Sequence, residues 1–144
     1  MKQLQKILLN MDAAVESQHA LQAAIKLSRL SGATIVAVNV VNHHVVTSLA
    51  RHSGRSLAEI EVELEEDGWR YLYTAEEEGK NAGARIVLMQ ERGYPEEILP
   101  RLAAKFQADL IVIGQSPRMR SDVPCSRIVE QMLEHTPCSL LIVR

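Results

Sequence analysis

The residues of this chain best suited to bind a charged ligand follow its most apolar short run. Residues 109–113 read Asp-Leu-Ile-Val-Ile, and Gly114 comes directly after them. Arg118, Arg120 and Arg127 lie in the segment that follows. A guanidinium group binds phosphate through two parallel hydrogen bonds. The pattern therefore indicates either a site for a polyanion, a phosphorylated ligand or an acidic partner surface, or a basic loop that is merely solvated.

The other residues that could do chemistry give weaker signals. Cys125 and Cys138 are too few and too far apart for a CxxC redox pair or a zinc site, and Cys125 is either an activated or an inert thiol. We interpret His43 and His44 as loop histidines, because no carboxylate or cysteine lies near them at ligand spacing. The acidic residues of 61–67 form a solvated helix face, and no Ser/His/Asp or Cys/His arrangement is evident. We therefore expect no catalytic residues and no metal site.

The composition of the chain sets the class of protein. Its 144 residues predict one domain over residues 1–144. A net charge of −2 argues against a non-specific nucleic-acid binder. No apolar run is long enough for a signal peptide or a membrane span, so we expect a cytoplasmic protein without membrane insertion.

The apolar pattern predicts five strands and four helices in alternation. The expected strands lie at 6–12, 34–41, 85–90, 108–114 and 139–144, and the helices at 17–31, 56–82, 95–106 and from 128. Residues 42–55 show no clear period and are expected to be irregular and mobile. This alternation predicts a doubly wound parallel sheet with helices on both faces. In the strand order 3-2-1-4-5, Asp12 and Gly114 flank one crevice, and Gly114 turns the chain there with φ > 0.

Several local motifs occur in an order that resembles one known family. A strand ends in Asp12 and is followed by Ser17-Gln18-His19-Ala20, and a helix-to-strand step reads Ser-Gly-Ala-Thr-Ile at 31–35. Gly-Tyr-Pro-Glu-Glu-Ile follows at 93–98, then the run 108–114 and the tail Thr-Pro-Cys-Ser-Leu-Leu-Ile-Val at 136–143. Together these pieces resemble the universal stress protein family over nearly the whole chain.

This resemblance implies an α/β fold similar to the adenine-nucleotide alpha-hydrolases and a homodimer formed through the last strand, Leu140–Val143. It implies a role in stress survival rather than enzymatic turnover. Members of the family that bind ATP carry Gly-x2-Gly-x9-Gly-Ser/Thr after the fourth strand. Here Gly114 matches the first glycine, but Pro117 stands at the second, Ser126 at the third and Arg127 at the hydroxyl position. Proline has no N–H to offer a phosphate, so tight ATP binding is not expected.

The same resemblance gives Asp12 the adenosine part of a nucleotide and places Val40 in the wall of an adenine pocket. From the residues alone, Asp12 could equally cap the loop that follows it, Val40 could be core, and Gly114 could be a turn glycine. We therefore expect a cytoplasmic, homodimeric stress-response protein that acts by binding a ligand or a protein. The alternative is an adenine-nucleotide module that binds ATP or AMP with weak or no hydrolysis.

Overall fold

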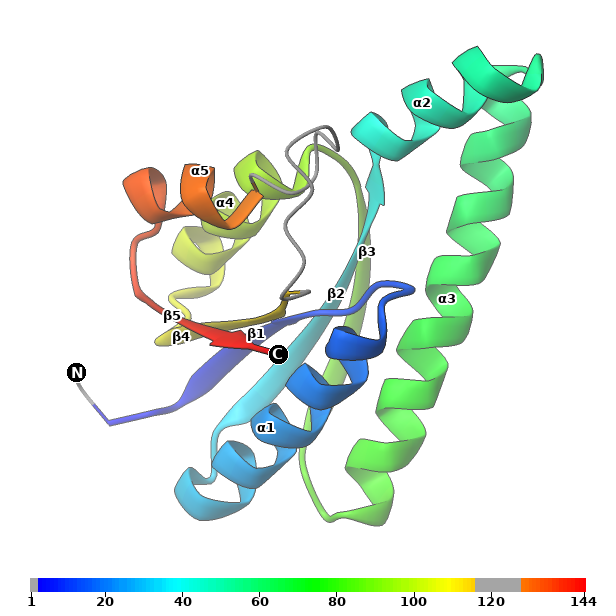
Figure 1. Cartoon of the computed structure of the whole chain (residues 1–144). Coiled ribbons are helices and arrows are strands. Elements are labelled where there is room, and N and C mark those ends of the chain that lie inside the picture. Colours follow the sequence, from blue (N-terminus) through cyan, green and yellow to red (C-terminus); the bar gives the residue numbers. More distant parts are fainter. Residues whose placement is uncertain (1–2, 116–127) are drawn as a thin grey trace.

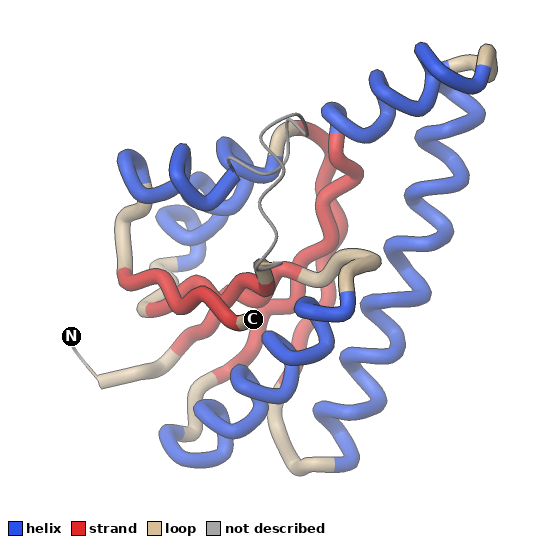
Figure 2. The backbone as a smooth tube through the Cα atoms, in the orientation of Figure 1, coloured by secondary structure: helices blue, strands red, loops and turns tan. Residues whose placement is uncertain are grey.

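A computed structural model describes residues 3–115 and 128–144, and its centre is a five-stranded parallel sheet (Figures 1 and 2). The strand order β3-β2-β1-β4-β5 is the predicted one. The elements in chain order are β1 (Lys6–Asn10), α1 (Val15–Ser31), β2 (Thr34–Asn42), α2 (His43–Ser53), α3 (Leu57–Asn81), β3 (Ile86–Gly93), α4 (Pro95–Phe106), β4 (Leu110–Gly114), α5 (Ile128–His135) and β5 (Ser139–Val143).

The sheet separates two apolar layers. Helices α1 and α3 cover one face, and α4 and α5 cover the other (Figure 1). Side chains alternate along each strand, so Leu9 and Val112 enter the first layer while Leu8 and Ile111 enter the second. All four are fully buried, and burying a side chain of this size contributes about 1.5–3 kcal/mol. The run Leu110–Ile113 is thus buried on both faces, as its lack of polar alternation predicted.

Local signals place the helix ends where the sequence predicted them. The Ser56 hydroxyl accepts a hydrogen bond from the backbone N–H of Glu59 (3.2 Å), which is half of the expected capping box. Gly32 ends α1 at φ 79°, a left-handed conformation that glycine adopts at little cost. Pro95 occupies the first turn of α4, where its missing N–H is not needed.

The expectation of an irregular segment at 42–55 was wrong. Residues His43–Ser53 form the helix α2, a fifth helix in the described part of the chain. The Asn42 side chain accepts a hydrogen bond from the backbone N–H of His44 (2.9 Å) and caps this helix. Val46 is the one buried residue of α2 and packs with Val41 and Ile60 in a small apolar cluster.

Candidate functional site

The predicted crevice lies where the parallel strands β1 and β4 end. Leu9 pairs with Val112, so continuing the register by two residues brings Met11 level with Gly114. Asp12 follows Met11 directly. The structure therefore brings Asp12 and Gly114 to the same edge of the sheet, from positions about a hundred residues apart in the sequence.

Asp12 is held by the turn that joins β1 to α1. Its backbone N–H donates to Ser17 Oγ (3.0 Å), and the backbone N–H of Ala14 donates to Asp12 Oδ1 (2.9 Å). Asn10 Nδ2 donates to Asp12 Oδ2 (3.3 Å), and the Ser17 hydroxyl donates to the Asn10 carbonyl (3.4 Å). The Asp12 carboxylate thus does cap the loop, which was one of the two roles left open for it.

Burial makes this carboxylate unusual. Desolvation raises the pKa of Asp12 above its ordinary value, and the negative charge of Glu16 adds to the rise. The hydrogen bonds from Ala14 and Asn10 act against the rise without cancelling it. A carboxylate oxygen has two lone pairs, so each oxygen of Asp12 retains acceptor capacity for a further donor.

Gly114 has a different role from the predicted one. Its φ is not in the left-handed region, so the expectation of a φ > 0 turn was wrong. A Cβ at this position would lie 2.3 Å from the backbone oxygen of Glu16 and 2.7 Å from the backbone nitrogen of Ser17. Both distances are far shorter than a van der Waals contact. Glycine is therefore required because the first turn of α1 packs directly on the backbone of β4.

The other predicted site residues divide into two groups. Val40 is buried in the apolar layer beneath α4 and α5, close to the carboxyl end of β2. It is thus a core residue in the structure, and its contact with an adenine ring stays a prediction. The remaining candidates lie outside the described residues, and these are Pro117, Arg118, Arg120, Cys125, Ser126 and Arg127.

A cluster of side chains that the sequence did not suggest lies at the carboxyl ends of β2 and β3. His44 Nε2 lies 2.6 Å from Glu96 Oε1, and the ring of Tyr94 lies 4.6 Å from that of His44. His43 Nε2 lies 3.9 Å from Glu61 Oε1. These histidines therefore belong to the first turn of α2, and their interpretation as loop residues without nearby carboxylates was wrong. Local spacing could not have found the pair, because Glu96 is 52 residues from His44.

The acidic face of α3 is also less solvated than expected. Arg92 of β3 forms ion pairs with Glu61 (3.5 Å) and with Glu65, and both glutamates are partly buried. In the described part of the chain, no three His, Cys, Asp or Glu side chains form a group that could hold a metal ion. None of the described helices is both long enough and apolar enough to cross a membrane.

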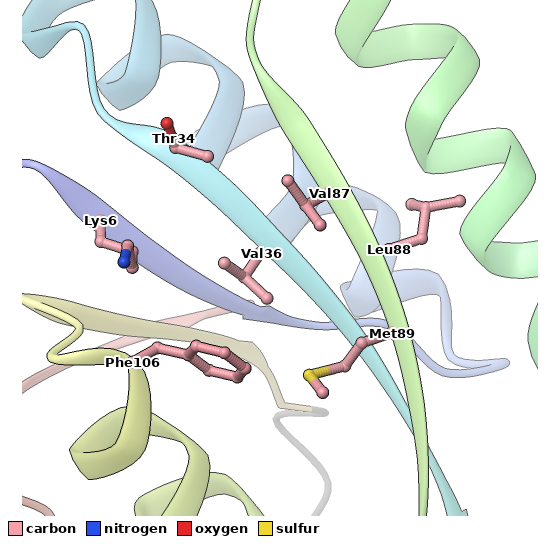
Figure 3. A pocket seen from close by; sticks show the side chains of 7 residues that line it. All are labelled: Lys6, Thr34, Val36, Val87, Leu88, Met89 and Phe106. Atoms are coloured by element: carbon pink, nitrogen blue, oxygen red, sulfur yellow. The ribbon is translucent and has the colours of Figure 1, made fainter.

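A shallow apolar groove lies away from this edge, near the amino ends of the strands. It has a volume of about 410 Å³. The side chains that line it are Lys6, Thr34, Val36, Val87, Leu88, Met89 and Phe106 (Figure 3). Val87 of β3 lines the groove and is 54% exposed. Because none of the predicted site residues lines it, the groove is separate from the crevice at Asp12 and Gly114.

The parallel sheet and its strand order define a doubly wound α/β fold, a class in which ligands bind at the carboxyl edge of the sheet where the strand order changes direction. Comparison with known proteins assigns the family. The model of the universal stress protein family matches residues 3–144. The chain belongs to this family.

Individual relatives agree with this assignment. A Staphylococcus aureus (strain USA300) protein, provisionally named a universal stress protein, is 27% identical over 143 residues, which cover 96% of this chain and 82% of that protein. The fold is similar to that of the universal stress protein UspA from Lactobacillus plantarum, with a TM-score of 0.80, 18% identity and full coverage of both chains.

Two further solved structures are described with nucleotides. A universal stress protein in complex with cAMP has a TM-score of 0.70 at 20% identity, and the match covers 99% of this chain and 98% of that one. A universal stress protein from Archaeoglobus fulgidus in complex with dAMP has a TM-score of 0.68 at 16% identity and full coverage of both chains. At these identities the likeness shows a shared fold.

Proposed function

We propose that this chain is a cytoplasmic, homodimeric stress-response protein that acts through ligand and protein contacts rather than through turnover. In this proposal the crevice at Asp12 and Gly114 accepts the nucleoside part of an adenine nucleotide but does not hold a triphosphate tightly. The observation that carries the proposal is the geometry of Asp12, which is fixed by its turn, partly desolvated, and retains free acceptor lone pairs. The sugar of a nucleotide offers hydroxyl donors, which suit such a carboxylate.

The phosphate side of the site supports a weak rather than a tight interaction. Pro117 has no backbone N–H to give a phosphate, Ser126 adds a side chain where the ATP-binding motif has a glycine, and Arg127 stands at its hydroxyl position, so three phosphate contacts of the motif are altered. If three such contacts each contribute about 1 kcal/mol, their loss weakens binding by about two powers of ten. A nucleotide with one phosphate loses least by this change, and the nucleotides named for two structural neighbours, cAMP and dAMP, each carry one phosphate.

Calorimetric titration with AMP, ATP and inorganic phosphate tests this proposal. We expect AMP and ATP to bind with similar, weak affinity, because the nucleoside part supplies most of the interaction. Replacing Asp12→Asn removes a charged acceptor, which is worth about 1.5–3 kcal/mol, so AMP affinity should fall about ten- to hundredfold. Glu16→Gln is the matched control, since it removes a neighbouring charge without touching the Asp12 contacts. Equal AMP affinity in Asp12→Asn and the wild type would contradict the assignment.

A second candidate function is an adenine-nucleotide module that holds its ligand firmly and hydrolyses it slowly or not at all. The neighbours solved with cAMP and dAMP favour it. Native mass spectrometry of the purified protein separates the two functions. A nucleotide that co-purifies, or ATP binding that is tight and depends on magnesium, supports the module, and a nucleotide-free protein supports the first proposal.

The homodimer is proposed to form through β5. This strand lies at one end of the sheet and pairs only with β4 within the described residues. An unpaired strand edge favours pairing with another chain, and a two-fold axis would make that pairing antiparallel. Ile142 on this strand is 40% exposed, so Ile142→Lys should leave the monomer folded while it disrupts the dimer. Light scattering should show twice the monomer mass for the wild type and for the control Leu30→Lys on α1, but the monomer mass for Ile142→Lys.

A further inference from the structure

The strand β2 contains a buried polar residue that its apolar pattern does not explain. Asn39 is only 5% exposed and lies in a strand otherwise buried through Ala, Ile and Val side chains. An unpaired buried amide is unfavourable, so its partners identify its role. Asn39 Nδ2 donates to the backbone carbonyl of Met11 (2.9 Å). The backbone N–H of Met11 in turn donates to the carbonyl of Val38 (2.7 Å), so β2 holds Met11 by both of its backbone groups.

A second amide holds Asn39 in place. Gln90 of β3 is its direct cross-strand partner, and Gln90 Nε2 donates to Asn39 Oδ1 (3.2 Å). The same nitrogen donates to the backbone carbonyl of Glu65 in α3 (2.9 Å). A chain of hydrogen bonds, here called the amide relay, therefore runs from α3 through Gln90 and Asn39 to Met11. Asn39 and Gln90 pair across the sheet, and continuing the registers of β1 past Asn10 brings Met11 level with Asn39 and with Gly114.

Helix α3, at which the relay begins, has a glycine where it approaches the two amides. A Cβ at Gly68 of α3 would lie 2.0 Å from Asn39 Oδ1 and 2.7 Å from Gln90 Nε2. No larger residue fits at this position while both amides keep their places. Gly68 lies inside a helix, where glycine is less favourable than alanine. This cost is offset only if the close approach to the amides is itself favourable.

We propose that Asn39 is a positioning residue for the nucleoside site, which sets the place of Asp12 by fixing the carbonyl of Met11, the residue before it. Asn10, Met11 and Asp12 form the turn that leaves β1, and the Asp12 contacts described above are all local to that turn. The relay, together with the bond from the Met11 N–H to the Val38 carbonyl, connects this turn to β2, β3 and α3. The expected effect of Asn39 on nucleotide binding rests on the proposed function. The positioning of the Asp12 carboxylate can be measured without any ligand.

The test compares Asn39→Ala with Ser28→Ala. Ser28 is also buried, and its hydroxyl donates to the Ala33 carbonyl (2.6 Å) at the far end of the same face. Both variants lose a buried hydrogen bond to a backbone carbonyl, and Asn39→Ala also loses the bond that Gln90 Nε2 donates. Both should therefore unfold at lower urea concentration than the wild type, and Asn39→Ala at the lower of the two. The discriminating measurement is the titration of the Asp12 carboxyl group, followed by NMR of ¹³C-labelled protein without ligand.

We expect Asn39→Ala to shift the Asp12 titration toward the ordinary range, because a loosened turn admits water to the carboxylate. Ser28→Ala should leave that titration unchanged. AMP affinity should fall about tenfold in Asn39→Ala, as expected when the displaced Asp12 carboxylate loses about one hydrogen bond to the nucleotide, and this fall should disappear in the Asp12→Asn background. A purely structural Asn39 would lower stability and leave the Asp12 titration as it is in the wild type, and that result would overturn the proposal.

Two further arms keep the test decisive. If Asn39→Ala does not fold, Gln90→Leu replaces it, since it removes the anchor of Asn39 and keeps the bond to Met11. A smaller shift of the Asp12 titration in the same direction is then expected, and no shift counts against the relay. If the wild type fails to bind AMP, the nucleotide proposal fails, while the ligand-free titration still decides whether Asn39 positions Asp12.

Discussion

The segments that follow β1 and β2 begin at the same edge of the sheet but are attached to it in different ways. The turn after β1 is fixed by short polar contacts among Asn10, Asp12 and Ser17, and it packs on the bare backbone of Gly114. The helix α2, which follows β2, buries only Val46 and extends past the end of the sheet (Figure 1). It is also held by the His44–Glu96 pair and by the longer His43–Glu61 pair.

At this edge of the sheet, the turn after β1 therefore forms a rigid side, and helix α2 forms a loosely attached side. The rigid side carries the carboxylate whose direction must be fixed to recognise a ligand. The loose side has few buried apolar contacts, which is the physical condition for local opening at low free energy. We expect the amides of α2 to exchange with solvent far sooner than those of β4, whose side chains lie in both apolar layers.

The largest expected effect comes from filling the contact on the rigid side. Gly114→Ala places a methyl group 2.3 Å from the Glu16 carbonyl oxygen, so α1 must shift away from β4. Overpacking of this kind costs about 3 kcal/mol in the free energy of unfolding. Gly54→Ala, just after α2, is the control, because it meets no atom within 4 Å and bears only the strain of φ 69°, about 1 kcal/mol. Urea unfolding measures both, and equal losses would mean that the close packing at Gly114 has been misjudged.

The next effect concerns the loose side. Val46→Ala removes two methyl groups from the small cluster that holds α2, which weakens it by about 1.5 kcal/mol. This loss should appear in the local opening of α2, measured by hydrogen exchange of its amides, and hardly at all in global unfolding. Val38→Ala provides the contrast, because Val38 lies in the apolar layer beneath α4 and α5, where a truncated side chain should destabilise the whole protein. Similar global losses in the two variants would show that α2 unfolds together with the sheet.

A smaller effect is expected at the His44–Glu96 pair that holds α2. His44→Ala breaks a partly buried pair with Glu96 and removes the ring contact with Tyr94, and we expect about 1 kcal/mol easier opening of α2. His135→Ala on the exposed part of α5 should have no measurable effect, since its pair with Glu134 is fully accessible to water. Hydrogen exchange of α2 again gives the measurement. Unchanged exchange in His44→Ala would show that the His44–Glu96 pair does not hold α2 in place.

The sequence predicted the sheet and several helix ends better than the two segments that leave its carboxyl edge, for a physical reason. Strand order, the Ser56 cap and the end of α1 at Gly32 follow from local chemistry, and the structure confirms them. The role of Gly114 depends on a helix turn nearly a hundred residues earlier, so the residue could be singled out while its purpose was misread. Asn42 is a local signal for the start of α2, which the prediction of an irregular segment did not use. No local pattern indicated the His44–Glu96 pair, because only the fold brings these two residues together.

The smallest expected effect on the free energy of unfolding arises from Asp12, on the rigid side, and depends on pH. Burial raises the pKa of Asp12 in the folded protein, so between the ordinary and the raised pKa the folded state binds more protons than the unfolded state. Stability attributable to Asp12 is therefore fully present below the ordinary pKa and is lost as the pH rises through the raised one. Asp12→Asn does not titrate, so it should be at least as stable as the wild type at pH 7, and this advantage should vanish in acid. Urea unfolding across that pH range measures the difference. An Asp12→Asn variant that is less stable at neutral pH would mean that the carboxylate holds the turn together, and that the rigid side depends on its charge rather than merely tolerating it.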